Sequence, residues 1–170
     1  DGAVHKRPGW CCFVAMRIRN RPLMVLAVAL SCSCNVVKMQ TRKQTRALIR
    51  DGYTAYTFTD ARGDHFAWAR GTGKPKILLS HGYTGQGRIQ WTGLAGALSD
   101  RFDAIMPDLL CHGHSTTWDT ARSGESMNAQ VAHVVLILDS LHITEPVIVV
   151  GNSYGGGVAA YLAEQHPERV

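Results

Sequence analysis

The chain has 170 residues, of which 45% are hydrophobic and 18% are charged, a balance typical of a globular domain and not of a disordered chain. Its net charge of +5 is unevenly spread, because residues 1–50 carry ten Lys or Arg and one acid while residues 51–170 carry eight Lys or Arg and twelve acids. The presumed domain is therefore mildly acidic, and we expect no nucleic-acid partner.

Residues 1–50 are predicted to form a basic leader and linker that is separate from a domain at residues 51–170. Arg17, Arg19 and Arg21 precede the apolar run Leu23–Leu30, and small Ser and Cys residues follow as far as residue 34. A charged region, an apolar run and small residues in this order are typical of a secretory signal peptide, and the run is too short to cross a membrane. Met16 is a candidate start of the protein.

Three interpretations of residues 16–34 stay open: ordinary export, lipidation at a cysteine, or a plain apolar helix cap or mistranslated upstream stretch. A real signal predicts a periplasmic, secreted or lipid-anchored protein, and its absence predicts a cytoplasmic one. We expect membrane association, if there is any, only through this segment. Residues 35–52 have few apolar positions and predict a solvated basic linker or a frayed helix.

Four of the five cysteines lie before residue 35, which leaves Cys111 alone in the presumed domain. We therefore expect no disulfide framework, so that burial of apolar side chains must hold the fold.

Strands alternate with helices beyond residue 52. A period of two predicts the strands Tyr53–Thr59 and His65–Arg70, joined as a hairpin. Apolar patterns predict further strands and helices, with Ser123 as a candidate cap: strands at Lys76–Ser80, Phe102–Met106 and Val147–Val150, and helices at Ile89–Leu98, Glu125–Leu141 and Val158–Glu164. This order predicts an α/β fold of three layers, with a mostly parallel sheet that begins with an antiparallel hairpin.

The strongest chemical pattern is Gly-Asn-Ser-Tyr-Gly at residues 151–155, between a strand that we expect to be covered on both faces and a helix. A serine on so sharp a turn has a strained backbone, and Gly151 and Gly155 must lack side chains so that the neighbouring backbones can pass. The helix N-terminus also favours negative charge that develops nearby. The pattern predicts that Ser153 is a nucleophile, and a plain glycine-rich turn is the alternative.

Three stretches in this order resemble the α/β-hydrolase fold superfamily: His81-Gly82, Asp108 through Ser115, and Gly151–Gly157. The resemblance covers about residues 53–170 and is greatest to the esterase and carbon–carbon-bond hydrolase branches. It implies that Ser153 is the nucleophile and that the backbone amides of Tyr83 and Tyr154 form the oxyanion hole. It also implies a set of structural motif residues: His81, Gly82, Asp108, Gly113, Gly151 and Gly155.

Other polar residues near these stretches are predicted to have structural roles. We expect His81 to hydrogen-bond within its own loop, Asp108 to anchor the loop after its strand, and Asp119 and Asp139 to be surface carboxylates. His112 and His114 crowd onto one turn without a second ligand cluster, so we expect no metal and no cofactor. Cys111 replaces a glycine that is common in the family. The Tyr83 side chain either lines a pocket or packs in the core.

In the family, the triad acid and histidine follow the serine in chain order. Here only Glu164, Glu168 and His166 follow it, and His166 stands most of ~20 Å down the helix. We therefore expect no triad acid or histidine in this chain, which would be the N-terminal part of a truncated α/β-hydrolase fold. The sequence predicts a serine hydrolase acting on a small ester or related acyl or carbonyl compound; the alternative is a non-catalytic fragment or binding module.

Three structural expectations follow from this interpretation. The three later strands should be parallel and should bring His81-Gly82, Asp108 and Ser153 together at one edge of the sheet. Residues 1–50 should add no strand, and their deletion should leave the stability nearly unchanged. Because no strand follows, the strand Val147–Val150 should have an unpaired apolar edge.

Overall fold

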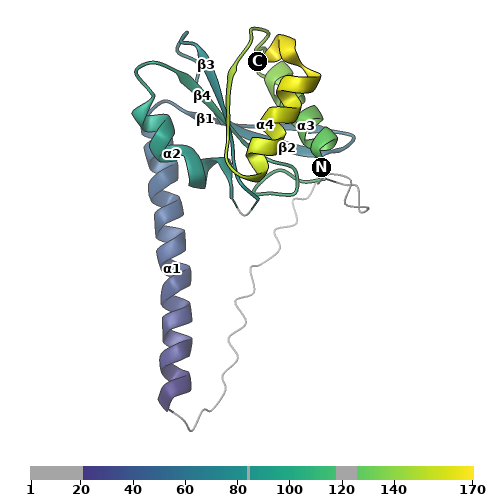
Figure 1. Cartoon of the computed structure of the whole chain (residues 1–170). Coiled ribbons are helices and arrows are strands. Elements are labelled where there is room, and N and C mark those ends of the chain that lie inside the picture. Colours follow the sequence, from purple (N-terminus) through teal and green to yellow (C-terminus); the bar gives the residue numbers. More distant parts are fainter. Residues whose placement is uncertain (1–20, 84, 118–125) are drawn as a thin grey trace, which may run out of the picture. The chain divides into compact units, whose positions relative to one another are not determined.

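The computed structural model describes residues 21–83, 85–117 and 126–170 (Figure 1). The chain divides into two compact units, Asp1–Lys38 and Met39–Val170. The helices are α1 (Arg21–Arg50), α2 (Gly87–Ala97), α3 (Met127–Ser140) and α4 (Tyr154–Gln165), with a 3-10 turn, η2, at Pro167–Arg169. The strands are β1 (Thr54–Asp60), β2 (Gly63–Ala69), β3 (Lys76–Ser80), β4 (Asp103–Asp108) and β5 (Ile148–Gly151).

The five strands form one mixed sheet in the order β1-β2-β4-β3-β5. The hairpin of β1 and β2 is antiparallel, and β2 is also antiparallel to β4. The pairs β3–β4 and β3–β5 are parallel, as predicted for the three later strands. The carboxyl ends of these strands therefore meet at one edge of the sheet, where ligands of open α/β sheets bind.

Helices cover both faces of the sheet, so the predicted three layers are present in the unit Met39–Val170 (Figure 1). Side chains alternate between the faces along each strand. One core cluster joins α3 and α4 to strand residues such as Ala67, Leu78 and Ile105. The other joins Ala95 of α2 to the opposite face, where Trp68 of β2 is buried.

Strand β5 is less buried than its apolar sequence predicts. Among the described residues, β5 is an edge strand: it pairs with β3 on one side and with no strand on the other. Ile148 is 49% exposed, and Val149 and Val150 are partly buried. Val149 packs against the first core cluster and Val150 against the second, so each face of the strand is covered in part, and the expected unpaired apolar edge is confirmed for the described part of the chain.

Residues 21–50 form helix α1, and none of them joins the sheet, as predicted. The expected solvation fails at the end of this helix, because Leu48 is 1% exposed and belongs to the second core cluster. Gln44 Nε2 also donates to the carbonyl oxygen of Ile89, 3.0 Å away. In the part of the chain that the structure describes, no helix is both long enough and apolar enough to cross a membrane.

The ends of two helices differ from the predicted ones. Helix α4 begins at Tyr154, four residues before the predicted start, because Gly155–Gly157 are helical and are not a turn. Helix α3 is capped by Ser126, whose side chain accepts a hydrogen bond from the Ala129 N–H at 3.2 Å. The predicted cap Ser123 lies outside the described residues.

Candidate active site

Ser153 lies between β5 and α4 with φ 51° and ψ −115°, a backbone conformation that residues with side chains rarely adopt. Two hydrogen bonds fix the turn: the Gly155 N–H donates to the Asn152 carbonyl at 2.9 Å, and the Gly156 N–H donates to the Ser153 carbonyl at 2.9 Å. The side chain is exposed at the N-terminus of α4. Ser153 is therefore presented to solvent where helix amides favour negative charge.

Glycine is required on both sides of this serine. A Cβ atom at Gly151 would collide with the backbone of Gly155. A Cβ atom at Gly155 would collide with the carbonyl oxygens of Ser80 and His81. The strand, the turn and the loop after β3 thus approach more closely than side chains permit. This close approach is the steric cause that we predicted for the two glycines that flank Ser153.

The three motif loops meet at this edge, as predicted. The Asn152 N–H donates to the Ser80 carbonyl at 3.1 Å, and a Cβ atom at Gly82 would lie 3.6 Å from the Ser153 Cβ. The loop after β4 joins them, because the Leu109 N–H donates to Nε2 of His81 at 2.9 Å. The ends of β3, β4 and β5 therefore form a single site.

His81 is fully buried and hydrogen-bonds within its loop, as predicted. Because its Nε2 accepts from Leu109, its Nδ1 carries the proton and donates to the Gly82 carbonyl at 2.7 Å. Burial lowers the pKa of His81. The ring is thus a neutral link between two loops, and neither nitrogen is open to a substrate.

Asp108 anchors the loop after β4, as predicted, and it is 1% exposed. Its Oδ1 accepts the Gly87 N–H at 2.8 Å, at the start of α2. Its Oδ2 accepts the His114 N–H at 3.0 Å and lies 3.0 Å from Nδ1 of the same residue. Gly113, at φ +56°, passes so close that a Cβ atom there would collide with this carboxylate.

Cys111 has φ 65°, in the left-handed region where glycine is favoured. This conformation explains why the family commonly has glycine at the position. Cys111 is exposed, so its thiol fits the turn, but the backbone strain remains.

An aromatic cluster of Tyr83, His112 and Tyr154 lies beside the nucleophile position. The Tyr83 ring meets those of His112 and Tyr154 edge-on, at centroid distances of 5.3 and 5.5 Å. Tyr83 is 54% exposed, so of the two predicted roles core packing is wrong. The sequence did not indicate this cluster, because its members come from two separate loops and the start of α4.

The other residues considered from the sequence lie away from this edge. His166 caps the far end of α4, and its Nδ1 is 3.2 Å from Oε1 of Glu168. Asp139 is a surface carboxylate, as predicted, and pairs with Nη1 of Arg169 at 2.7 Å. Asp119 lies outside the described residues. Among those that are described, no group of three His, Cys, Asp or Glu side chains could hold a metal.

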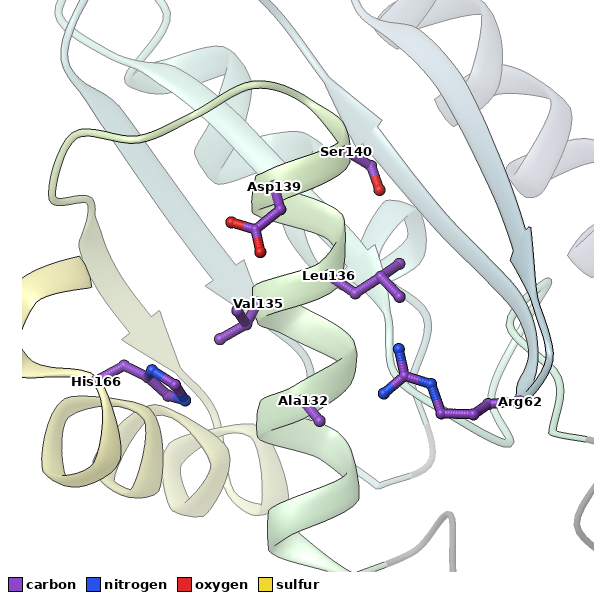
Figure 2. A pocket seen from close by; sticks show the side chains of 7 residues that line it. All are labelled: Arg62, Ala132, Val135, Leu136, Asp139, Ser140 and His166. Atoms are coloured by element: carbon purple, nitrogen blue, oxygen red, sulfur yellow. The ribbon is translucent and has the colours of Figure 1, made fainter.

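A shallow pocket of about 370 Å³ lies on the outer side of α3 (Figure 2). Its lining contains no residue of the three motif loops: it consists of Arg62, Ala132, Val135, Leu136, Asp139, Ser140 and His166. The charged side chains there are already paired, Arg62 with Asp60 and Asp139 with Arg169. The pocket is therefore separate from the Ser153 site.

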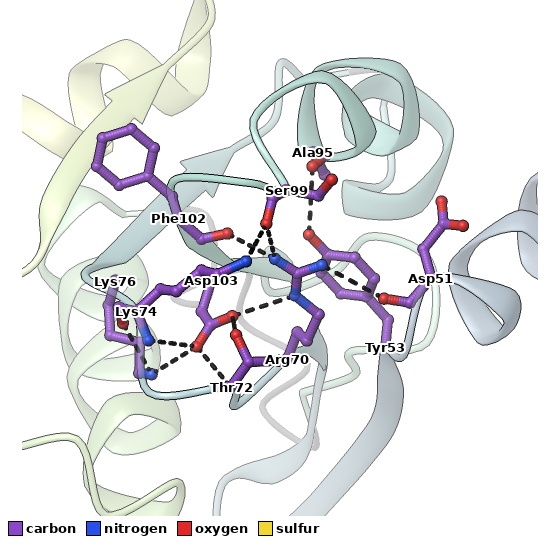
Figure 3. Close-up of polar contacts among 10 residues, drawn as sticks. All are labelled: Asp51, Tyr53, Arg70, Thr72, Lys74, Lys76, Ala95, Ser99, Phe102 and Asp103. Atoms are coloured by element: carbon purple, nitrogen blue, oxygen red, sulfur yellow. Dashed lines mark hydrogen bonds and ion pairs between the residues drawn. The ribbon is translucent and has the colours of Figure 1, made fainter.

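A cluster of polar contacts surrounds Asp103 at the opposite end of β4 (Figure 3). Asp103 is fully buried, and its carboxylate lies 3.1 Å from Nε of Arg70 and 3.1 Å from Nζ of Lys76. The Thr72 N–H and hydroxyl donate to it at 2.6 and 2.7 Å. The sequence did not indicate this cluster, which holds the loop before β3 against the start of β4.

Comparisons with known proteins agree with this architecture. A family model described as alpha/beta hydrolase fold matches residues 75–170. An uncharacterized protein of Mycobacterium tuberculosis (strain ATCC 25618 / H37Rv) is 37% identical over 133 residues, which are 78% of this chain and 38% of that protein. The 2-hydroxymuconate semialdehyde hydrolase of Pseudomonas sp. (strain CF600) is 38% identical over 103 residues, or 59% of this chain and 35% of the relative.

Among solved structures, a serine hydrolase from Cycloclasticus zankles matches with a TM-score of 0.63 and 27% identity, over 69% of this chain and 43% of that one. The chain thus spans less than half the length of each of these three proteins.

Proposed function

Because the chain belongs to the alpha/beta hydrolase fold family, we propose that it carries the nucleophile and the oxyanion hole of a serine hydrolase acting on a small ester or a related acyl or carbonyl compound. The observation that carries the proposal is the backbone of Ser153, held at φ 51° between β5 and α4. A strained residue of this kind persists only where the surroundings impose it, and such residues cluster at active sites.

In the proposed reaction the Ser153 hydroxyl attacks the acyl carbon, and the acyl oxygen becomes negative. The backbone amides of Tyr83 and Tyr154 donate to that oxygen, and the N-terminus of α4 adds a favourable field. One such donor typically contributes about 3 kcal/mol to transition-state stabilisation. The closeness of Gly82 to Ser153 supports this role, because Tyr83 follows Gly82 directly.

The proton of the serine must pass to a general base, and neither His81, in the loop after β3, nor His166 supplies it. Both ring nitrogens of His81 are engaged in its loop, and His166 lies at the far end of α4. We therefore propose that the chain performs nucleophile positioning and oxyanion stabilisation, while the base and acid belong to other residues. Alone, these two contributions leave only a small part of the rate of a complete triad.

The name of one relative supports the branch of chemistry. It is a 2-hydroxymuconate semialdehyde hydrolase, and a hydrolase of that kind acts on a carbonyl compound. The aromatic cluster of Tyr83, His112 and Tyr154 provides an apolar wall beside Ser153 for such a small molecule.

Labelling with a fluorophosphonate probe, followed by peptide mass analysis, tests the proposal. We expect slow modification confined to Ser153, because the oxyanion hole also stabilises attack on phosphorus. Ser153→Ala should abolish the label, and Ser126→Ala, which removes a serine outside the site, should retain it. Equal labelling of several serines would refute the nucleophile. Complete absence of labelling would favour the alternative, a non-catalytic binding module.

A further inference from the structure

Two buried histidines that the proposed reaction does not use face each other inside the domain. His65 of β2 and His133 of α3 are each 1% exposed. Their Nδ1 atoms are 2.7 Å apart, a hydrogen-bond distance. The outer nitrogens are engaged as well: Nε2 of His65 lies 2.9 Å from Oδ1 of Asp60, and Nε2 of His133 lies 2.9 Å from the Asp108 carbonyl oxygen.

These three contacts determine how many protons the pair holds. A carbonyl oxygen only accepts, so Nε2 of His133 must carry a proton. A carboxylate also only accepts, so Nε2 of His65 must carry one too. Two neutral rings would then place two bare Nδ1 lone pairs against each other at 2.7 Å, which is repulsive. A third proton between the Nδ1 atoms removes this conflict.

We propose that His65 and His133 share three ring protons in the folded protein, so that His65 is a buried cation that donates both to Asp60 and to a neutral His133. This histidine pair links the β1–β2 hairpin, helix α3 and the loop after β4 by hydrogen bonds, and the link depends on the third proton. We call it the histidine tie. It is independent of the proposed hydrolase chemistry.

The charged groups around the pair suit one positive charge. Asp60 balances His65, and it also accepts from Arg62, at 2.7 Å from Nη2. These contacts with His65 and Arg62 hold the pKa of Asp60 well below its ordinary value. From the remaining elements, Arg62 and the neighbouring His81 and His65 oppose a second positive charge on His133. The Asp108 carboxylate is engaged with α2 and His114.

Burial first, and then the charge of His65, lower the pKa of His133 to about 3. His133 therefore stays neutral between pH 5 and pH 9, as the proton count requires.

The tie reaches the candidate active site through a backbone atom. The Asp108 carbonyl accepts both from His133 and from the Ser115 hydroxyl, and the Asp108 side chain anchors the start of α2. Loss of the third proton would leave the two Nδ1 lone pairs in contact, so the rings would separate. The hairpin and α3 would then no longer be held together at this point.

The pH dependence has two limbs of opposite sign. In the unfolded chain both histidines titrate near pH 6.5, so below it they hold two extra protons and above it none. The folded pair holds one. Stability therefore rises with pH below about 6.5 and falls with pH above it, each limb by at most about tenfold in the folding equilibrium constant per pH unit.

Nitrogen-15 correlation spectra of the histidine rings in the full chain at pH 7.5 test the proton count directly. Protonated and bare ring nitrogens have separate shifts, and we expect three protonated nitrogens among the four of His65 and His133. A count of two would overturn the proposal. This measurement needs no variant, so it decides the matter even if the variants below fail to fold.

The folding equilibrium of variants from pH 5 to pH 9, followed by urea denaturation, tests the two limbs. His133→Gln should make the acid limb shallower by about one proton, because the remaining ring of the pair is charged in both states below about pH 6.5, while buried His81, whose pKa is lowered by burial, keeps its own share of that limb. His65→Gln should lose the alkaline limb, because above about pH 6.5 the remaining ring, that of His133, is neutral in both the folded and the unfolded state. The matched control is His142→Asn, at an exposed histidine, which should retain both limbs. Parallel profiles for wild type and all three variants would overturn the proposal.

Discussion

Two residues with side chains near the site, Ser153 and Cys111, have positive φ angles of 51° and 65°. At Ser153 the strained backbone presents the hydroxyl at a helix N-terminus, so the strain has a role in the proposed function. At Cys111 no such purpose is visible in the structure, and the left-handed backbone costs about 1–2 kcal/mol relative to a right-handed one.

Cys111→Gly should therefore stabilise the protein. Glycine removes the left-handed penalty but adds about 0.5–1 kcal/mol of unfolded-chain entropy, so we expect a net gain of about 0.5–1 kcal/mol. Urea denaturation at pH 7 measures it. The matched control is Cys111→Ala, which removes the thiol and keeps the strain, and it should give no gain. An equal gain in both variants would assign the effect to the thiol instead.

The glycines around Ser153 differ in whether the structure leaves room for a side chain. Gly155→Ala places a methyl group against the Ser80 and His81 carbonyls, and we expect a loss of about 3 kcal/mol or more together with loss of probe labelling at Ser153. Gly156→Ala is the control, because its Cβ atom would meet no atom closer than 3.6 Å and alanine favours the helix by up to about 1 kcal/mol. Similar destabilisation by the two changes would contradict the steric argument.

At the scale of elements, the Asp103 cluster joins the ends of β2, β3 and β4. The side chains of Arg70 and Lys76 are 8% and 13% exposed, so they lose most of their hydration and depend on the Asp103 charge. Arg70 also donates from Nη2 to the Ser99 and Phe102 carbonyls, at 2.5 and 2.9 Å (Figure 3). The cluster therefore ties the loop after α2 to the sheet, at the end opposite Ser153.

Asp103→Asn should cost about 3 kcal/mol, because it leaves two buried cations without their carboxylate. Burial raises the pKa of Asp103, but the hydrogen bonds from Thr72, Lys76 and the Lys74 amide outweigh it and hold the pKa well below 3.8. The unfolded carboxyl binds its proton first as pH falls, so this stabilisation is complete above about pH 5 and is lost progressively as the pH falls below about 4 towards the folded pKa. Urea denaturation from pH 3 to pH 7 measures both effects.

The matched control is Asp100→Asn, at an exposed carboxylate nearby. It should leave both the stability and the acid limb as in wild type. An acid limb that is equally steep in Asp103→Asn and in wild type would show that Asp103 does not cause it.

The end of helix α1 belongs to the core, which corrects the expectation that deletion of residues 1–50 is harmless. Leu48→Ala should cost about 2–5 kcal/mol, because Leu48 is 1% exposed among core side chains. Ile49→Ala is the control, since Ile49 is 60% exposed, and it should change the stability by less than about 0.5 kcal/mol. Thermal unfolding of the two variants, measured side by side, distinguishes the core helix from a solvated linker, for which both would be neutral.

The sequence predicts the elements and the three motif loops because both depend on local patterns. Periodicity locates β3 and β5 within a residue, and the glycine spacing locates the turn that holds Ser153. Contacts between distant residues have no such pattern. His65 meets His133 across 68 positions, and Lys76 meets Asp103 across 27, so neither cluster could be predicted from the sequence. The burial of Leu48 and the exposure of Ile148 likewise depend on which elements lie next to them.

At the scale of the whole molecule, the two edges of the described sheet differ in character. Strand β1, at one edge, has threonine at three of its seven positions and ends in Asp60. Strand β5, at the other, exposes Ile148 and partly exposes Val149 and Val150. A polar edge discourages pairing with another chain, whereas an apolar edge with unpaired amides favours it.

We therefore expect the 170-residue chain to self-associate through β5. Light scattering and sedimentation should show association that increases with concentration. Ile148→Lys should reduce it, because a charge on an edge strand opposes pairing with a second strand. Ile89→Lys is the matched control, since Ile89 is 45% exposed on helix α2 and should leave the association unchanged. Equal effects of the two lysines would assign the association to net charge and not to the edge.

The activity expected of this same chain follows from the site and not from the edge. Ser153 has its proposed oxyanion donors, but His81 and His166 are committed elsewhere, so proton removal from the hydroxyl is unassisted. Hydrolysis of a short-chain aryl ester should hence be hardly faster than with Ser153→Ala, since a serine without its base loses most of the triad's rate enhancement. Turnover by a cooperatively unfolding monomer that disappears in Ser153→Ala would contradict this, and it would mean that another histidine already present acts as the base. His112 would then be tested first, by His112→Ala, because its ring lies 5.3 Å from that of Tyr83.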